Sequence, residues 1–184
     1  MQLSSGLPFF KGAVAVSVAA LLAFAPGTIQ ANAAVLGPQA DKCADDHGPA
    51  VLVEIAGLKK RSGSLRIQSY GGDPSRFFEK GAWLERIDVP VPAAGSVSVC
   101  VPVPKPGTYA ISVRHDMNGN GKSDMSDGGG MSGNPEISLF DLMFKKKPPA
   151  REVVFTVGDH VRTITVTMNY VQGGAFRPIK QASR

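Results

Sequence analysis

Oxygen-bearing side chains recur at alternate positions in the segment 115–127, which reads HDMNGNGKSDMSD. This spacing resembles the calcium-loop pattern D-x-[DN]-x-[DN]-G-x5-E. A glycine at its sixth position, Gly121, lets the chain turn sharply, so that the flanking side chains can surround one cation. Ca²⁺ takes six to eight oxygen ligands. The sequence therefore predicts a Ca²⁺ site made by Asp116, Asn118, Asn120, the backbone carbonyl of Lys122, Asp124 and Asp127.

This segment differs from an EF-hand loop in its closing ligand and in the element before it. Asp127 is one methylene shorter than the usual Glu, and Ser123 stands where EF-hand loops carry an apolar residue. A strand, not a helix, is expected to precede it. Because Asn118-Gly119 and Asn120-Gly121 also suit turns that need positive φ, a metal-free turn is the alternative. Three carboxylates predict a modest affinity, with a dissociation constant of about 10⁻⁴–10⁻³ M.

The N-terminus has the three-part pattern of a secretory signal peptide. Lys11 supplies a positive charge, residues 12–24 form an apolar run, and Ala31-Asn32-Ala33 provides an A-x-A cleavage site. The apolar run is shorter than the roughly 20 residues that a transmembrane helix needs. We therefore expect residues 1–33 to be removed on export, a periplasmic or secreted mature chain, and no transmembrane span within it.

The chain has two cysteines, Cys43 and Cys100. An even number of cysteines in an exported chain predicts a disulfide, because compartments outside the cytoplasm are oxidising. Two free thiols are the alternative. Cys100 alternates with Val99 and Val101, so it should lie on the opposite face of their strand. The predicted bridge then fastens the segment 34–50 to the outside of a sheet.

The chain carries a formal net charge of +5, which becomes +4 once Lys11 is removed with the signal peptide. Basic residues gather at 145–147 and toward the C-terminus, where Arg177, Lys180 and Arg184 lie. Such an excess can attract anionic partners, including lipopolysaccharide and nucleic acid. These basic residues are not interleaved with aromatic ones, however, and export argues against a nucleic-acid role. We expect a solvated positive surface and no nucleic-acid partner.

The sequence shows no arrangement typical of a catalytic centre. The histidines His47, His115 and His160 lack the H-x-x-x-H spacing of a zinc site, so we expect no enzyme activity and no catalytic residues. We expect His115 to be a hydrogen-bonded histidine at the end of a strand. Two alternatives stay open: a carbohydrate-binding module that uses Trp83, and a hydrolase with its site in the segment 116–149.

Alternating apolar residues predict the strands that must position these groups. Residues at i, i+2 and i+4 share one face of a strand, which places that face on the core and the other in water. The pattern predicts an all-β fold, an antiparallel β-sandwich of about seven strands, immunoglobulin-like or prealbumin-like, with a long Gly-rich loop. After the signal peptide, we expect no helix beyond one turn within 74–80. The expected strand runs are 51–55, 65–67, 87–91, 97–101, 109–113, 153–157 and 164–170.

Residues 106–124, PGTYAISVRHDMNGNGKSD, resemble the central motif of the DUF2141 family of exported bacterial proteins, PGTYAV…HDxNGNGxxD. In the family a Gly-rich segment that ends in a proline follows, and here it occupies 128–135. The resemblance covers roughly residues 50–171 and implies a β-sandwich with no established activity. The triple glycine 128–130 and Asn134-Pro135-Glu136 depart from a regular Gly-x-Pro stretch, which leaves the conformation of this segment open.

These signals divide the chain into a signal peptide 1–33, an N-terminal segment 34–50, a β-sandwich domain 51–171 and a basic C-terminal tail 172–184. The segment 116–149 is unusually long for a connection in a compact domain, and such loops commonly carry function. The predicted function is an exported, non-enzymatic binding or structural module of the cell envelope, stabilised by one Ca²⁺ and one disulfide. Its partner would be an unknown protein or glycan.

Overall fold

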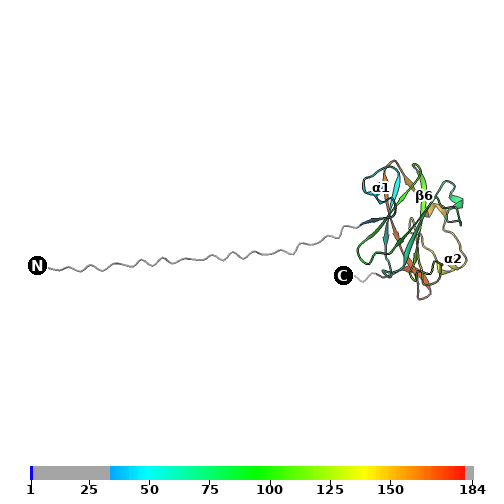
Figure 1. The fold of residues 1–184 in the computed structure, drawn as a ribbon. Helices are drawn as coiled ribbons and strands as arrows, with labels where there is room; N and C mark the ends of the chain where they lie inside the picture. Colours follow the sequence, from blue (N-terminus) through cyan, green and yellow to red (C-terminus); the bar gives the residue numbers. More distant parts are fainter. Residues whose placement is uncertain (2–33, 181–184) are drawn as a thin grey trace. The chain divides into compact units, whose positions relative to one another are not determined.

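The computed structural model describes Met1 and residues 34–180 (Figure 1). The predicted cleavage site and the apolar run before it lie outside these residues. Residues 34–180 build two β-sheets whose apolar faces share one core. The fold is therefore an all-β sandwich, as the alternating pattern predicts. The described residues form eleven strands, more than the seven expected, because three segments without clear alternation also join the sheets and the expected run 164–170 contains two strands.

The larger sheet is antiparallel throughout. Its strands are β3 (Ser64–Gly71), β4 (Glu85–Pro90), β6 (Gly107–Asp116), β7 (Gly128–Met131), β8 (Phe155–Val157), β10 (Asn169–Gln172) and β11 (Ala175–Pro178). They run in the order β11-β10-β7-β6-β3-β4, and β8 also pairs with β6. The long strand β6 thus has β3 along one edge and both β7 and β8 along the other.

The smaller sheet mixes parallel and antiparallel pairs. Its strands are β1 (Val35–Leu36), β2 (Ala50–Ala56), β5 (Val97–Pro102) and β9 (Val161–Thr167), in the order β1-β5-β2-β9. β5 and β2 are antiparallel, whereas β1 is parallel to β5 and β9 is parallel to β2. A parallel neighbour requires a long connection, and here the strands β3 to β8 lie between β2 and β9 in sequence.

The core lies between the two sheets and consists mainly of β-branched residues. Such side chains favour strands because they pack well on a pleated surface. Each strand places every second residue inward, as the sequence predicts. The fully buried members include Val51 and Val53 of β2, Val99 and Val101 of β5, Leu65 and Ile67 of β3, and Ile111 of β6.

The apolar run 164–170 is not one strand but two strands in different sheets. β9 ends at Thr167 and β10 begins at Asn169, and the buried Met168 lies between them. The Met168 N–H donates to the Ala56 carbonyl across 2.9 Å, which holds the crossing point against the end of β2. Alternation continues through this point because both sheets face the same core.

Part of the expected Gly-rich loop is the strand β7. A side chain at Gly128 would collide with the Tyr170 ring, and a Cβ at Gly130 would lie 2.7 Å from a Val166 side-chain carbon. The sheet therefore has no room for side chains here, which explains the triple glycine. Glycine is unfavourable in β-strands, so the local sequence did not predict β7.

Short helices and a further strand occupy segments that were expected to be irregular. The 3₁₀ turn η1 (Pro74–Arg76) lies where a single turn was predicted. The helices α1 (Ala40–Ala44), α2 (Leu139–Met143) and α3 (Ala150–Val153) were not predicted, and α3 includes Val153, the first residue of the expected strand run 153–157, which is a strand only in β8. β11 lies within the segment that was expected to be a C-terminal tail, where it pairs with β10.

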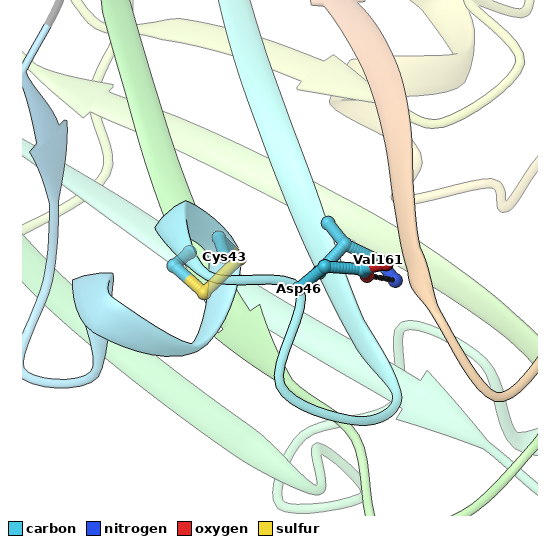
Figure 2. Close-up of a disulfide and its surroundings, with 4 residues drawn as sticks. Cys43, Asp46 and Val161 are labelled. Atoms are coloured by element: carbon cyan, nitrogen blue, oxygen red, sulfur yellow. Dashed lines mark hydrogen bonds between the residues drawn. A yellow bond between two sulfur atoms is a disulfide. The ribbon is translucent and has the colours of Figure 1, made fainter.

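The disulfide prediction is confirmed: Cys43 of α1 is bonded to Cys100 of β5, with 5.7 Å between the two Cα atoms (Figure 2). Cys100 is fully buried although it points away from the inner valines, because α1 covers this face of the smaller sheet. Asp46 adds a second attachment, since its carboxylate accepts a 2.6 Å hydrogen bond from the Val161 N–H (Figure 2). Residues 40–46 are thus fastened to the outside of the sheet on both β5 and β9, whereas β1, which precedes them, forms an edge strand of the sheet itself.

The Asp46 attachment should weaken in acid. The hydrogen bond from Val161 and then the neighbouring His160 lower the pKa of the Asp46 carboxyl below its ordinary value of 3.8. A folded-state pKa below the unfolded one gives stabilisation that is complete above about pH 4 and is lost as the pH falls through the folded pKa. Carbon-13 NMR titration of the folded and urea-unfolded chain should show the lower midpoint in the folded state. Equal midpoints would contradict this prediction.

Candidate functional site

The candidate metal loop, residues 116–127, connects two neighbouring strands of the larger sheet. β6 ends at Asp116 and β7 begins at Gly128, and the pairing of His115 with Gly128 brings the two ends of the loop together. Asp116 and Asp127 therefore stand side by side in the fold at the base of the loop. Their exposed fractions are only 2% and 7%, so both carboxylates need polar partners.

Backbone N–H groups of the loop supply those partners. The Asp116 carboxylate accepts from Asn120 at 3.2 Å and from Gly121 at 2.8 Å. The Asp127 carboxylate accepts from Met117 and from Asp124, both at 3.3 Å. The loop backbone thus curves around the two carboxylates and directs its N–H groups toward them. Gly121 has φ +74, the left-handed conformation that the predicted sharp turn requires.

The exposed Asp124 gathers the rest of the loop. One of its oxygens accepts from the side-chain nitrogens of Asn118 at 3.0 Å and Asn120 at 2.8 Å, and the other accepts from Ser126. These hydrogen bonds, that of the Ser126 hydroxyl first, hold the pKa of the Asp124 carboxyl far below its ordinary value. Asp124 is therefore ionised at neutral pH. Lys122 lies on the outside, where its N–H donates to the Asn120 side-chain oxygen at 2.7 Å.

The loop thus brings together all the predicted ligand residues, but hydrogen bonds satisfy them. Within the described residues, no three acidic, histidine or cysteine side chains converge as they would around a metal ion. The donor chemistry nevertheless fits Ca²⁺, since carboxylate, amide and carbonyl oxygens are the ligands it prefers. The side-chain nitrogens of Asn118 and Asn120 point toward Asp124. For Ca²⁺ to bind in the centre of the loop, both side-chain amides would have to rotate so that their oxygens face the ion.

Arg114 is a loop partner that sequence reasoning missed. Its guanidinium lies 3.5 Å from the Asp116 carboxylate and donates to the Ser123 hydroxyl at 3.0 Å. It balances part of the negative charge at the base of the loop. The available signal was its position two residues before Asp116, on the strand that leads into the loop.

His115 forms part of the floor beneath the loop and is fully buried. The Ser62 carbonyl lies 2.8 Å from Nε2 of His115 and can only accept, so Nε2 carries a ring proton and donates to it. With that proton on Nε2, Nδ1 accepts from the Tyr170 hydroxyl at 2.7 Å, and the Tyr170 oxygen accepts the Lys59 N–H at 3.2 Å. Burial raises the pKa of the Tyr170 hydroxyl, which keeps it a donor. Both ring nitrogens of His115 are thus engaged.

Replacing Tyr170 by Phe should lower the free energy of unfolding by roughly 2–3 kcal/mol, because it leaves a buried imidazole nitrogen and a backbone N–H without a partner. Urea unfolding measures this loss. Tyr109→Phe is the matched control, since the Tyr109 hydroxyl makes one bond to the nearby Lys105 carbonyl, and its loss should cost only about 1 kcal/mol. Equal losses in the two variants would contradict the role given to Tyr170.

The strap, residues 132–149, follows β7 and carries α2. Asn134 fastens its start to the outer edge of β9: its side-chain nitrogen donates to the Thr165 carbonyl at 3.0 Å and its oxygen accepts the Thr167 N–H at 2.7 Å. The amide thereby satisfies part of an exposed strand edge. Farther along, a groove of about 620 Å³ separates the strap from β10 and β11, and Asp141, Phe176 and Arg177 are among its lining residues.

The residues behind the two alternative functions lie in less favourable surroundings. Trp83, the basis of the carbohydrate-binding alternative, is 36% exposed, and the Arg86 guanidinium lies 4.5 Å from the centre of its ring. A cation on one indole face leaves less of the ring for stacking against a sugar. In the proposed hydrolase segment, the Asp116 carboxylate is buried and already accepts two backbone N–H groups.

A family model described as "Uncharacterized protein conserved in bacteria (DUF2141)" matches residues 53–165. The chain belongs to this family. The DUF2141 match runs from β2 into β9, so it includes the candidate metal loop, the strap and Cys100. Cys43 lies outside the DUF2141 region, and the disulfide therefore joins a flanking segment to the family's core. Searches of the curated proteins and of the solved structures each found no match.

Among the described residues, no helix has both the length and the apolar character that crossing a membrane requires.

Proposed function

We propose that this chain is an exported, non-enzymatic binding or structural module of the cell envelope, with the segment 116–149 as its recognition surface. One observation carries the proposal. Of the eight large apolar side chains that are exposed in the described residues, five lie in this segment: Met125, Phe140, Leu142, Met143 and Phe144. Apolar side chains gathered on one exposed segment are typical of interaction sites.

The rest of the molecule supports the proposal by holding this segment on a rigid frame. The two sheets share a buried core, and the disulfide fastens the N-terminal segment over the smaller sheet. A disulfide also suits an oxidising compartment outside the cytoplasm, which agrees with the predicted signal peptide. Loops on rigid scaffolds commonly carry recognition, since they vary without disturbing the core.

Ca²⁺ in the candidate metal loop would stabilise the base of the recognition surface. The residues that would hold it are Asp116, Asn118, Asn120, Lys122 through its carbonyl, Asp124 and Asp127. The ion would neutralise three carboxylates that now depend on N–H donors and on Arg114. Because the loop already draws these residues together, binding would need amide rotation and no change in the strands.

A thermal melt with and without Ca²⁺ tests the metal site. The full chain is expressed for export, purified from the periplasm, and its N-terminus is determined by mass spectrometry. At 10 mM Ca²⁺, a site with the expected affinity stabilises the folded state by about 1.4–2.7 kcal/mol relative to EDTA, which raises Tm by several degrees.

Asp124→Asn should abolish the shift, whereas Asp159→Asn, at an exposed aspartate outside the loop, should retain it. An unchanged Tm in Ca²⁺, or an equal shift in the Asp124 variant, would remove Ca²⁺ from the proposal.

A further inference from the structure

The tip of the strap is an exposed apolar cluster that the fold holds in place. Phe140, Met143 and Phe144 have exposed fractions of 67%, 64% and 65%, and the centres of the two phenyl rings are 4.2 Å apart. No residue of α2 is buried. In Figure 1, α2 lies at the periphery of the sandwich. These side chains therefore contribute little to the core of the molecule.

Local hydrogen bonds fix α2 in its exposed position. Ser138 and Asp141 form a capping box, with the Asp141 N–H donating to the Ser138 hydroxyl at 3.0 Å and the Ser138 N–H donating back to the Asp141 carboxylate at 3.2 Å. The Phe144 N–H closes the turn on the Phe140 carbonyl at 3.0 Å. A capping box determines where a helix begins. The apolar cluster is thus a preformed feature.

Three lysines follow the apolar cluster directly. Residues 139–147 contain Lys145, Lys146 and Lys147 against the single acidic Asp141, a net charge of +2. Lys146 lies 3.3 Å from Asp141, and Lys147 lies 3.1 Å from Glu79 beyond the strap. Both lysine side chains remain substantially exposed, and exposed ion pairs of this kind are weak. The lysines can therefore exchange these partners for stronger anionic ones.

We propose that residues 139–147 form an interfacial anchor for a bilayer rich in anionic phospholipid. The phenyl rings and Met143 enter the boundary between headgroups and acyl chains, and Lys145, Lys146 and Lys147 contact lipid phosphates. Phe and Leu beside Lys are the residue types that such interfacial segments use. Protein interfaces, by contrast, are depleted of lysine. This inference rests on the proposed function, because it names the partner class of the same recognition surface.

Vesicle co-sedimentation in EDTA tests the anchor separately from the Ca²⁺ site. The exported, processed chain is mixed with phosphatidylcholine vesicles or with vesicles that also contain phosphatidylglycerol. We expect sedimentation with the anionic vesicles, little with the neutral ones, and release as salt rises, since salt screens the lysine–phosphate attraction. The absence of sedimentation with anionic vesicles would overturn the anchor, and a protein partner would then be sought for this surface.

Two pairs of variants assign the binding to these residues. Phe140→Ser with Phe144→Ser should weaken partitioning at least about tenfold, whereas Leu84→Ser, at an exposed apolar residue outside the recognition surface, should leave it unchanged. Replacing Lys145, Lys146 and Lys147 by Gln should remove the preference for anionic vesicles. The same change at Lys60, Arg61 and Lys105 should preserve it.

All these side chains are exposed, so thermal melts should show each variant folded. Wild-type-like binding of either strap variant would overturn the assignment. The Ca²⁺-dependent melt would still stand as an independent test of the metal loop if the vesicle experiment failed.

Discussion

Gly63→Ala is expected to lower the free energy of unfolding by roughly 4 kcal/mol. Gly63 has φ +78, and a Cβ there would overlap the backbone carbonyl oxygen of Asp116. The colliding atom belongs to the strand end that starts the candidate metal loop, so no flexible side chain can move aside. Alanine therefore incurs both left-handed strain and a shift of β6 relative to β3. Urea unfolding followed by circular dichroism measures the loss.

The variant Gly72→Ala separates the left-handed backbone strain from the steric collision. Gly72 has φ +80, nearly the same backbone conformation, but a Cβ there would meet no atom within 4 Å. This control should cost only about 1 kcal/mol, the usual penalty for alanine in the left-handed region. A similar loss in both variants would mean that strain alone matters and that the close approach of residue 63 to the loop base is unimportant.

Removal of the disulfide should have an effect of similar size. The bridge joins residues 57 apart, and a closed loop of this length restricts the unfolded chain by about 4 kcal/mol. The total stability of a domain is commonly only about 5–15 kcal/mol. The variant with Cys43→Ala and Cys100→Ala should therefore unfold at a clearly lower urea concentration than the wild type. The pairing of β1 with β5 and the hydrogen bond from Val161 to Asp46 would then still hold the N-terminal segment.

Reduction of the wild-type chain breaks the disulfide but keeps both sulfur atoms, so it separates the effect of the cross-link on stability from the effect of losing buried sulfur. Dithiothreitol should move the wild-type urea midpoint most of the way toward that of the double variant, and it should leave the double variant unchanged. If reduction has no effect on the wild type, the bridge does not restrict the unfolded state as expected. If the double variant is much less stable than the reduced chain, packing of Cys100 is the larger contribution.

The sequence predicted the strands whose inward positions repeat valine or isoleucine. β2, β3, β4, β5 and β6 all lie where alternation placed them. β7 was missed because its glycines are required by residues about 40 positions away, the ring of Tyr170 against Gly128 and Val166 against Gly130, and no local pattern records such contacts. The switch between β9 and β10 was missed because a strand that crosses between facing sheets keeps its inward alternation.

The candidate site was predictable in its residue types and spacing but not in its hydrogen bonds. The order of Asp116, Asn118, Asn120 and Gly121 indicated a tight oxygen-rich loop, and the structure contains one. The direction in which the asparagine amides point depends on where Asp124 lies in three dimensions. The cap of α2 did have a signal, Ser138-x-x-Asp141, but a single turn of helix lacks the repeated pattern that usually reveals one.

The parallel pairing of β2 with β9 has a consequence for how the chain assembles as it is made. β2 lies between β5 and β9, and the pair Ala50 and Val161 is 111 residues apart in sequence. As the chain emerges, β2 can pair with β5 early, but the other edge of β2 has no partner strand until residues 161–167 appear. A partly folded chain in which residues 161–167 have not yet paired would therefore be a template for intermolecular strand addition, and a chaperone that shields β2 would be most useful in this interval.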